Sequence, residues 1–201
     1  MGPPRTLFLA RHGETGWNAE GRWQGQTDVP LNERGRRQAR ALAAQVRDQG
    51  IAALASSDLR RARSTAEIVA GELGLEAVHL DADLREQGFG DFEGLTRGEC
   101  EARFPEAWAR YLLDPKTTPP KGESHAGLVW RVRAALERIV RDLAEPTLVI
   151  MHGGAMRALV AEHLGSIPNP ASTAWAASGI PNGGVFRLRL ASGRIVAAER
   201  L

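Results

Sequence analysis

The 201-residue sequence contains a single cysteine, Cys100, and this scarcity removes two classes of small protein. A disulfide framework within the chain needs at least two cysteines, and structural zinc sites are commonly built from several cysteine thiolates. Cys100 lies between Glu99 and Glu101, whose negative charges oppose the formation of a reactive thiolate. We therefore expect Cys100 to be chemically inert.

Long apolar runs are also missing. The apolar stretch at residues 7–10 is far too short for a signal peptide or a membrane span, and no later run approaches about 18 apolar residues. Neither sign of charge dominates, since 26 basic residues face 24 acidic ones. Such a balance gives no electrostatic reason to expect nucleic acid or a membrane as a partner. We expect a cytoplasmic protein.

What the sequence does have is an alternation of short apolar segments with amphipathic ones. Apolar runs predict buried strands, and apolar residues three and four positions apart predict helices. Asn32, Ser124 and either Ser57 or Asp58 are placed to cap helices. The predicted strands are 5–10, 51–56, 77–80 and 147–151, with a terminal hairpin of 184–190 and 194–200 that turns at Ser192-Gly193. The predicted helices are 32–49, about 57–73, 124–143 and 153–164, with short ones around 96–112.

This order of elements predicts an α/β fold. Strands that are apolar throughout and alternate with helices are typical of a parallel sheet that is covered on both faces. We expect one domain over residues 1–201, built as a three-layer sandwich with a mostly parallel central sheet. Residues 85–125 are rich in glycine and proline, and we interpret them as a small helical lid insertion that determines substrate specificity.

Charged and polar residues follow the predicted strands directly. Arg11-His12 comes after the first strand, and His152-Gly153 comes after the strand at 147–151. Because ligands bind at the carboxyl ends of parallel strands, we expect the two histidines to meet at one edge of the sheet. Ser56, Ser57 and Asp58 follow the second strand and belong to the same edge.

Three arginines, Arg60, Arg61 and Arg63, fall in the first turns of the helix after the second strand. Cations at a helix N-terminus oppose the helix dipole by roughly 0.3–1 kcal/mol each, and a bound anion would remove that conflict. For Arg60 and Arg63 we favour the simpler interpretation, that they point into water.

Two arginines, two histidines and helix N-termini together predict an anion site, and phosphate matches the forked donors of arginine. Gly153 and Gly154 open a helix, so their amides can approach an oxyanion closely. A histidine among cations is kept neutral by its like-charged neighbours, and its ring nitrogen can then attack phosphorus. The arginines can stabilise the transferring charge without a metal ion. No pair of histidines has the spacing of a known metal motif, and we expect no metal and no cofactor.

Four sequence blocks resemble the signature blocks of the histidine phosphatase superfamily, also called the phosphoglycerate mutase-like family. The blocks appear in the order that the family has, within residues 7–164. They are LARHGETGWNAEGRWQGQTDVPL, SSDLRRARSTAE, LREQGFGDFEG and VIMHGGAMRAL.

The resemblance implies a role for each matching residue. His12 is the nucleophile that becomes phosphorylated, and Glu86 protonates the leaving oxygen and then activates water. Arg11 and Arg61 clamp the phosphoryl oxygens, and His152 stabilises the transferring group. The remaining matches imply a phosphate pocket lined by Asn18, Gln24, Gly25 and the amide of Gly153.

We therefore predict a metal-independent phosphomonoester hydrolase that acts on a small phosphorylated metabolite. The alternative within the family is a cofactor-dependent phosphoglycerate mutase. The short chain argues against it, and so do Asp91 and Glu93, which we expect to repel a carboxylate-rich substrate. Two further hypotheses are a binding module with a decayed site and a metal-dependent hydrolase. A homodimer is compatible with the exposed strand edges of such a sheet.

Several further residues are open to two interpretations. His79 and His163 fit ordinary structural or surface roles, whereas His125 starts a helix in a region where relatives often place substrate contacts. Trp108, Tyr111 and Trp130 can either line a lid or pack in a core.

Overall fold

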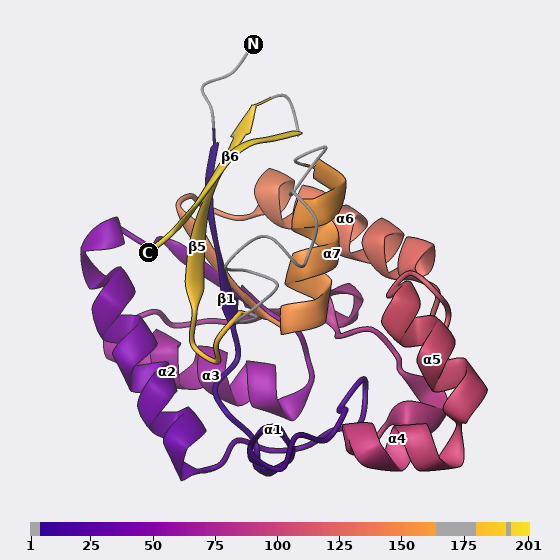
Figure 1. Cartoon of the computed structure of the whole chain (residues 1–201). Coiled ribbons are helices and arrows are strands. Elements are labelled where there is room, and N and C mark those ends of the chain that lie inside the picture. Colours follow the sequence, from indigo (N-terminus) through magenta and orange to yellow (C-terminus); the bar gives the residue numbers. More distant parts are fainter. Residues whose placement is uncertain (1–4, 164–179, 192–193) are drawn as a thin grey trace.

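The computed structural model describes residues 5–163, 180–191 and 194–201, which form a six-stranded sheet with helices on both faces (Figure 1). The strand order is β3-β2-β4-β1-β5-β6. The strands are β1 (Arg5–Arg11), β2 (Ala53–Ser56), β3 (His79–Leu80), β4 (Thr147–Met151), β5 (Val185–Ala191) and β6 (Arg194–Arg200). The expected turn at residues 192–193 and the expected helix end at residue 164 lie outside the described residues.

The sheet is mostly parallel, as predicted. β1 pairs with β4, β4 with β2, and β2 with β3, all in parallel, whereas β5 and β6 add an antiparallel edge beside β1. β2 is shorter than predicted because its pairing with β4 begins only at the Ala53–Thr147 register, where β4 itself begins. The carboxyl ends of β1, β2 and β4 consequently lie at one edge, with Arg11 paired directly to Met151.

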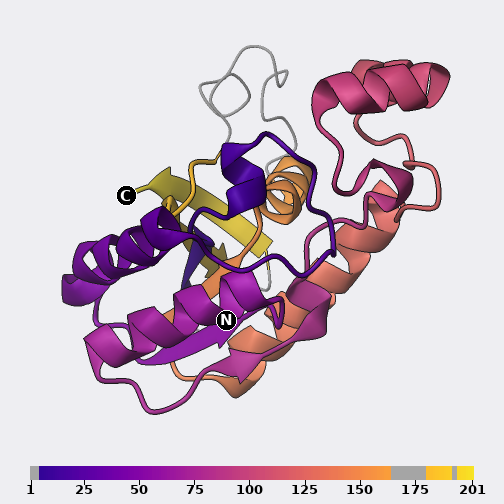
Figure 2. The same cartoon turned by 90° about the horizontal axis from the view of Figure 1, so that it is seen from below.

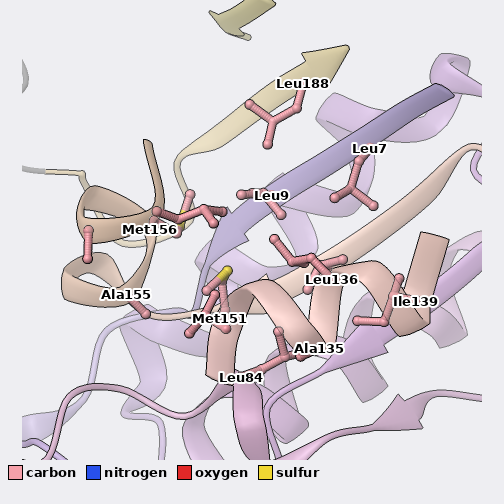
Figure 3. Packing of buried hydrophobic residues seen from close by; sticks show 14 of the residues in the cluster. Leu7, Leu9, Leu84, Ala135, Leu136, Ile139, Met151, Ala155, Met156 and Leu188 are labelled. Carbon is pink, nitrogen blue, oxygen red and sulfur yellow. The ribbon is translucent and has the colours of Figure 1, made fainter. Parts of the chain in front are cut away.

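Alternate residues of β1 enter two separate cores, which makes the three layers. Phe8 and Ala10 pack against α2 and α3 on one face, and Leu7 and Leu9 pack against α6 and α7 on the other. Figure 3 shows Leu7 and Leu9 above the residues of α6, with Met156 of α7 beside them. The helices are α1 (Gly16–Ala19), α2 (Glu33–Val46), α3 (Arg60–Leu73), α4 (Arg97–Arg103), α5 (Pro105–Leu113), α6 (His125–Asp142) and α7 (Gly153–His163).

Two of the three predicted helix caps are confirmed. The side chain of Asn32 accepts a hydrogen bond from the Gly35 amide at the start of α2, and Ser124 does the same from Gly127 at the start of α6. The cap predicted for α3 is wrong, because that helix begins after Leu59 with no side-chain cap. Ser57 and Asp58 are used elsewhere, in contacts with a histidine and an arginine.

The segment 85–125 carries α4, α5 and a small core of its own, which lies beside the end of α6 and away from α2 and α3 (Figure 2). Trp108 and Tyr111 are buried in this core, so the packing interpretation holds for them, while Trp130 on α6 is 74% exposed. Cys100 is also buried there, and burial, followed by the charge of Glu99, raises the pKa of its thiol. A raised thiol pKa fits the inert role predicted for Cys100. Across the described part of the chain, no helix combines the length and apolarity needed to cross a bilayer.

Candidate active site

A cavity of about 340 Å³ opens at the carboxyl edge of the sheet, between the body of the protein and the segment 85–125. Its volume falls within the usual range of small-molecule sites. It is lined by Arg11, His12, Asn18, Gly21, Arg22, Trp23, Gln24, Gly25, Arg61, Glu86, Phe89, Arg97, Gly153, Gly154 and Arg157. Every predicted site residue except His152 therefore lines one cavity, although the four sequence blocks are far apart along the chain.

His12 is held with one ring nitrogen engaged and the other available. Its Nδ1 lies 2.6 Å from the carbonyl oxygen of Gly13, and because a carbonyl can only accept, Nδ1 carries the proton. The proton-free nitrogen is then Nε2. The ring is only 3% exposed, and burial, followed by the charges of Arg61 and Arg11, holds the pKa of His12 well below 6.5. The imidazole is thus neutral at neutral pH, and the lone pair of Nε2 is available for reaction.

The Gly13 carbonyl sits in a close backbone crossing between the end of β1 and the start of α2. A Cβ on Gly13 would lie 2.4 Å from the Gly35 carbonyl oxygen, so a side chain here would force the two segments apart. The Gly13 amide also donates to the Thr65 hydroxyl of α3, 3.1 Å away. These contacts fix the peptide that orients His12.

His152 lies directly behind His12, with 5.1 Å between the ring centroids. It is fully buried, and its Nε2 lies 2.9 Å from the hydroxyl of Ser57. Its Nδ1 is buried without a hydrogen-bond partner among the described residues. Burial, followed by the charges of Arg61 and His12, lowers the pKa of His152 well below 6.5. Ser57 is therefore a positioning residue for the second histidine, which explains why it does not cap α3.

Arg61 is buried and Arg11 is half-buried; both line the cavity and are held by backbone carbonyls. Arg61 donates to the carbonyls of Thr27 and Gly25, 2.8 and 2.6 Å away, and Arg11 donates to Ile180 at 2.5 Å. The Nε atom of each guanidinium is buried with no partner among the described residues. Burial lowers the pKa of Arg61 to about 10 and also lowers the pKa of Arg11, while the charge of Glu86 opposes both shifts. Two cations with unmatched donors at one point form a site for an oxyanion.

Glu86 faces these cations from the start of the segment 85–125. Its carboxylate accepts hydrogen bonds from the amides of Gly154 and Ala155, both at 2.8 Å, and from Gln87 at 2.9 Å. The helix N-terminus predicted to receive an oxyanion thus holds the carboxylate of Glu86. Gly154 permits this approach, because a Cβ there would lie 2.5 Å from Oε1 of Glu86.

Asn18, Gln24 and Gly25, which the family resemblance places around the phosphate, also line the cavity. Gln24 and Asn18 are both bonded to Thr15, and the Gln24 oxygen lies 2.9 Å from its hydroxyl. Gly25 has φ +52°, and a Cβ there would overlap the carboxylate of Glu93, so this turn requires glycine. Its carbonyl is the one that holds Arg61.

Asp91 and Glu93, which we expected to repel a carboxylate-rich substrate, lie outside the cavity lining. Glu93 accepts hydrogen bonds from the amides of Gln26, Thr27 and Phe89, and Asp91 binds Lys121 at 3.1 Å. Both carboxylates are therefore used to hold loops, and neither contacts the cavity directly.

Other candidates lie apart from the cavity. Arg60 and Arg63 are exposed, as predicted, and Arg63 pairs with Glu67 one turn along α3. His125 does not line the cavity either. No group of three histidine, cysteine, aspartate or glutamate side chains with the arrangement of a metal site is found among the residues that the structure describes.

Sequence reasoning missed several residues of the site, of which four are polar or charged. Arg22, Arg97 and Arg157 line the cavity, and the amide of Asn182 binds the carbonyl of His12 at 3.0 Å. Arg157 could have been found, because on a helix it lies on the same side as Gly153, four residues earlier. Asn182 gave no signal, since only the fold brings the segment before β5 against the end of β1.

Comparison with known proteins matches residues 7–199 of the chain to a family model described as the histidine phosphatase superfamily, branch 1. Phosphoglycerate mutase-like protein 4 of Arabidopsis thaliana is 41% identical over 157 residues, 76% of this chain and 68% of the relative. A protein of Escherichia coli named Probable phosphoglycerate mutase GpmB is 42% identical over 164 residues, 79% of this chain and 74% of the relative. The structure of a mycobacterial glucosyl-3-phosphoglycerate phosphatase complexed with VO3 is 35% identical with a TM-score of 0.78, and the match covers 92% of each chain.

Proposed function

Because the chain belongs to the histidine phosphatase superfamily, branch 1, we propose that it hydrolyses phosphomonoesters of a small metabolite through a phosphohistidine on His12. The observation that carries the proposal is the orientation of His12. Its Nδ1 is fixed on the Gly13 carbonyl, which leaves a proton-free Nε2 in a cavity shared with Arg11 and Arg61, whose buried Nε donors are unmatched among the described residues.

The first half of the reaction forms the phosphoenzyme. The lone pair of His12 Nε2 attacks phosphorus, the bond from phosphorus to the ester oxygen breaks, and a protonated Glu86 gives its proton to the leaving oxygen. Acid catalysis of this kind is typically worth about 10²–10⁴-fold.

The second half transfers the phosphoryl group to water. The carboxylate of Glu86 takes a proton from water, the water oxygen attacks phosphorus, and the bond from phosphorus to Nε2 breaks. Inorganic phosphate leaves, and Glu86 is again protonated for the next turnover. The hydrogen bonds that the amides of Gly154 and Ala155 donate to the Glu86 carboxylate support this role as a base.

Arg11, Arg61 and His152 supply the charge and hydrogen bonds that the transferring group needs. Their donors are fixed before the substrate arrives, because backbone carbonyls and Ser57 hold them in place. Preorganised donors in a buried site stabilise developing charge most effectively. Metal independence is part of the proposal, and activity that is lost with EDTA and restored by magnesium would contradict it.

A phosphoglycerate mutase is the second candidate, and the names of the two curated relatives favour it. The solved relative that matches 92% of both chains is named a phosphatase, which favours hydrolysis. Phosphate release and the interconversion of 2- and 3-phosphoglycerate can be followed in one NMR experiment. Fast interconversion without net release of phosphate would select the mutase.

Trapping of the phosphoenzyme tests the proposal directly. Brief reaction with a ³²P-labelled phosphomonoester is expected to label the wild-type chain with an acid-labile, alkali-stable adduct, and His12→Ala is expected to lose both the label and hydrolysis of para-nitrophenyl phosphate. His79→Ala is the matched control, because His79 is an exposed histidine on the edge strand β3. Undiminished hydrolysis by His12→Ala would refute the phosphohistidine route, because the activity would then come from somewhere other than this site.

A further inference from the structure

The cavity carries more positive charge than a phosphoryl group requires. Five arginines line it, Arg11, Arg22, Arg61, Arg97 and Arg157, and Glu86 is the single carboxylate among the lining residues. A phosphomonoester brings about two negative charges near neutral pH. Arg11 and Arg61 already match those two charges when Glu86 carries the proton that the proposed first step requires.

The arginines differ in how their charge is balanced. Arg22 forms ion pairs with Glu20 at 2.8 Å and with Glu99 at 2.7 Å, so its charge is neutralised within the protein. Arg97 and Arg157 are exposed, and neither has a carboxylate within ion-pair distance in the parts of the chain that are described. Their charges remain unbalanced at the rim of the cavity.

The two rim arginines come from different parts of the fold. Arg97 begins α4 in the segment 85–125, and Arg157 lies on α7, the helix that also seats Glu86. The carboxylates that could have balanced them are held elsewhere, since Glu93 binds backbone amides and Asp91 binds Lys121. Both arginines therefore face the same cavity with no anion supplied by the described part of the protein.

We infer that the substrate carries a second anionic group, which Arg97 and Arg157 bind while Arg11 and Arg61 hold the phosphoryl group. The inference rests on the proposed function and names its substrate class, a phosphomonoester with a carboxylate or a second phosphate a few bonds away. Arginine pairs bind both groups through forked hydrogen bonds. Arg97 and Arg157 are then specificity residues.

Matched substrates measure the preference. 3-Phosphoglycerate and glycerol 3-phosphate differ in a carboxylate against a hydroxymethyl group, and fructose 1,6-bisphosphate and fructose 6-phosphate differ in a second phosphate. We expect the wild-type chain to show a ratio of kcat/KM of about tenfold or more for the two-anion member of at least one pair. The pair that shows the preference identifies the second group. A ratio near one in both pairs would overturn the inference.

Variants assign the preference to the rim. Arg97→Gln and Arg157→Gln are each expected to lower the ratio several-fold, and the double variant to bring it near one. Arg37→Gln is the matched control, because Arg37 is an exposed arginine on α2 that does not line the cavity. A ratio that survives in the double variant would show that other residues select the substrate.

Calorimetric binding of the same four compounds to the wild-type chain separates this inference from the proposed function. Tighter binding of a two-anion compound, weakened by the double variant and by salt, supports the second site even where no phosphate is released. Equal binding within both pairs refutes it even where hydrolysis is fast. The release of phosphate thus tests the proposed reaction, and the preference for two-anion compounds in binding and in kcat/KM tests the substrate class.

Discussion

The carboxylate of Glu86 rests on the N-terminus of α7, where the amide of Gly154 donates to it across 2.8 Å. The two residues are 68 positions apart in the sequence, and they join the segment 85–125 to the helix that follows His152. The contact places the proposed acid and base at the cavity wall, and it exists only because Gly154 has no side chain.

Gly154→Ala is expected to displace Glu86 and to lower kcat by about 10²-fold, the lower end of what acid–base catalysis contributes. The added Cβ would lie 2.5 Å from Oε1 of Glu86, a distance that atoms do not tolerate. Gly71→Ala is the matched control, because a Cβ there meets nothing within 4 Å in α3. That change should stabilise the helix by roughly 0.5–1 kcal/mol and leave kcat unaltered. Wild-type kcat in Gly154→Ala would show that the seat is dispensable.

Glu86→Gln is expected to slow esters of poor leaving groups far more than para-nitrophenyl phosphate. An alkoxide must be protonated as it departs, and the loss of this acid catalysis typically slows the reaction by about 10²–10⁴-fold. para-Nitrophenolate is a stable anion and leaves without a proton. The measurement is kcat/KM for an alkyl phosphate and for para-nitrophenyl phosphate in the wild type and the variant. Equal losses for both esters would mean that Glu86 does not protonate the leaving group in the step that limits kcat/KM.

The two buried histidines are expected to make the protein less stable in acid. His12 and His152 have pKa values well below 6.5 in the folded chain, so the unfolded chain binds protons first as the pH falls below about 6.5. The contribution of the two neutral histidines to the free energy of unfolding should therefore be fully present above that pH. Below it, the free energy of unfolding should decrease by up to about 1.4 kcal/mol per pH unit for each histidine.

Urea unfolding near pH 7 and near pH 5 checks this linkage. Carboxylates contribute to the same pH range, but their part is common to the wild type and His12→Asn and cancels in the difference. The wild type should lose more stability between the two pH values than His12→Asn does. An identical loss would show that His12 is not buried in its neutral form.

Arg131→Lys is expected to impair both folding and catalysis. Arg131 on α6 binds the carboxylate of Glu123 and donates to the carbonyls of Asp83, Arg85 and Glu86, at distances of 2.6–2.9 Å. A lysine keeps the positive charge but cannot reach all of these acceptors, and leaving buried carbonyls without a donor costs about 1–3 kcal/mol of stability.

The leaving-group ratio distinguishes positioning from stability in this variant. If Arg131 positions Glu86, the folded fraction of Arg131→Lys should favour para-nitrophenyl phosphate over an alkyl phosphate more strongly than the wild type does. Arg133→Lys, an exposed arginine on the same helix, should change neither quantity. A lower melting temperature with an unchanged ratio would assign Arg131 a structural role alone.

Most of the fold could be predicted because its signals are local. The apolar runs at β1 and β4 and the spacing of apolar residues in α2 and α6 depend on neighbours in the sequence. The boundaries were less accurate, since the start of β2 depends on where β4 begins. The cap of α3 was wrong because Ser57 binds His152, a partner 95 residues away.

The sequence by itself determined that arginines and histidines follow the strands of a parallel sheet, and therefore that they meet at one edge. Only the tertiary structure decided which other charges enter the cavity. It kept Asp91 and Glu93 out of the cavity lining and brought in Arg97. The physical reason is that the direction of a side chain in the segment 85–125 depends on distant packing and hydrogen bonds, whereas a residue at a strand end inherits its direction from the sheet.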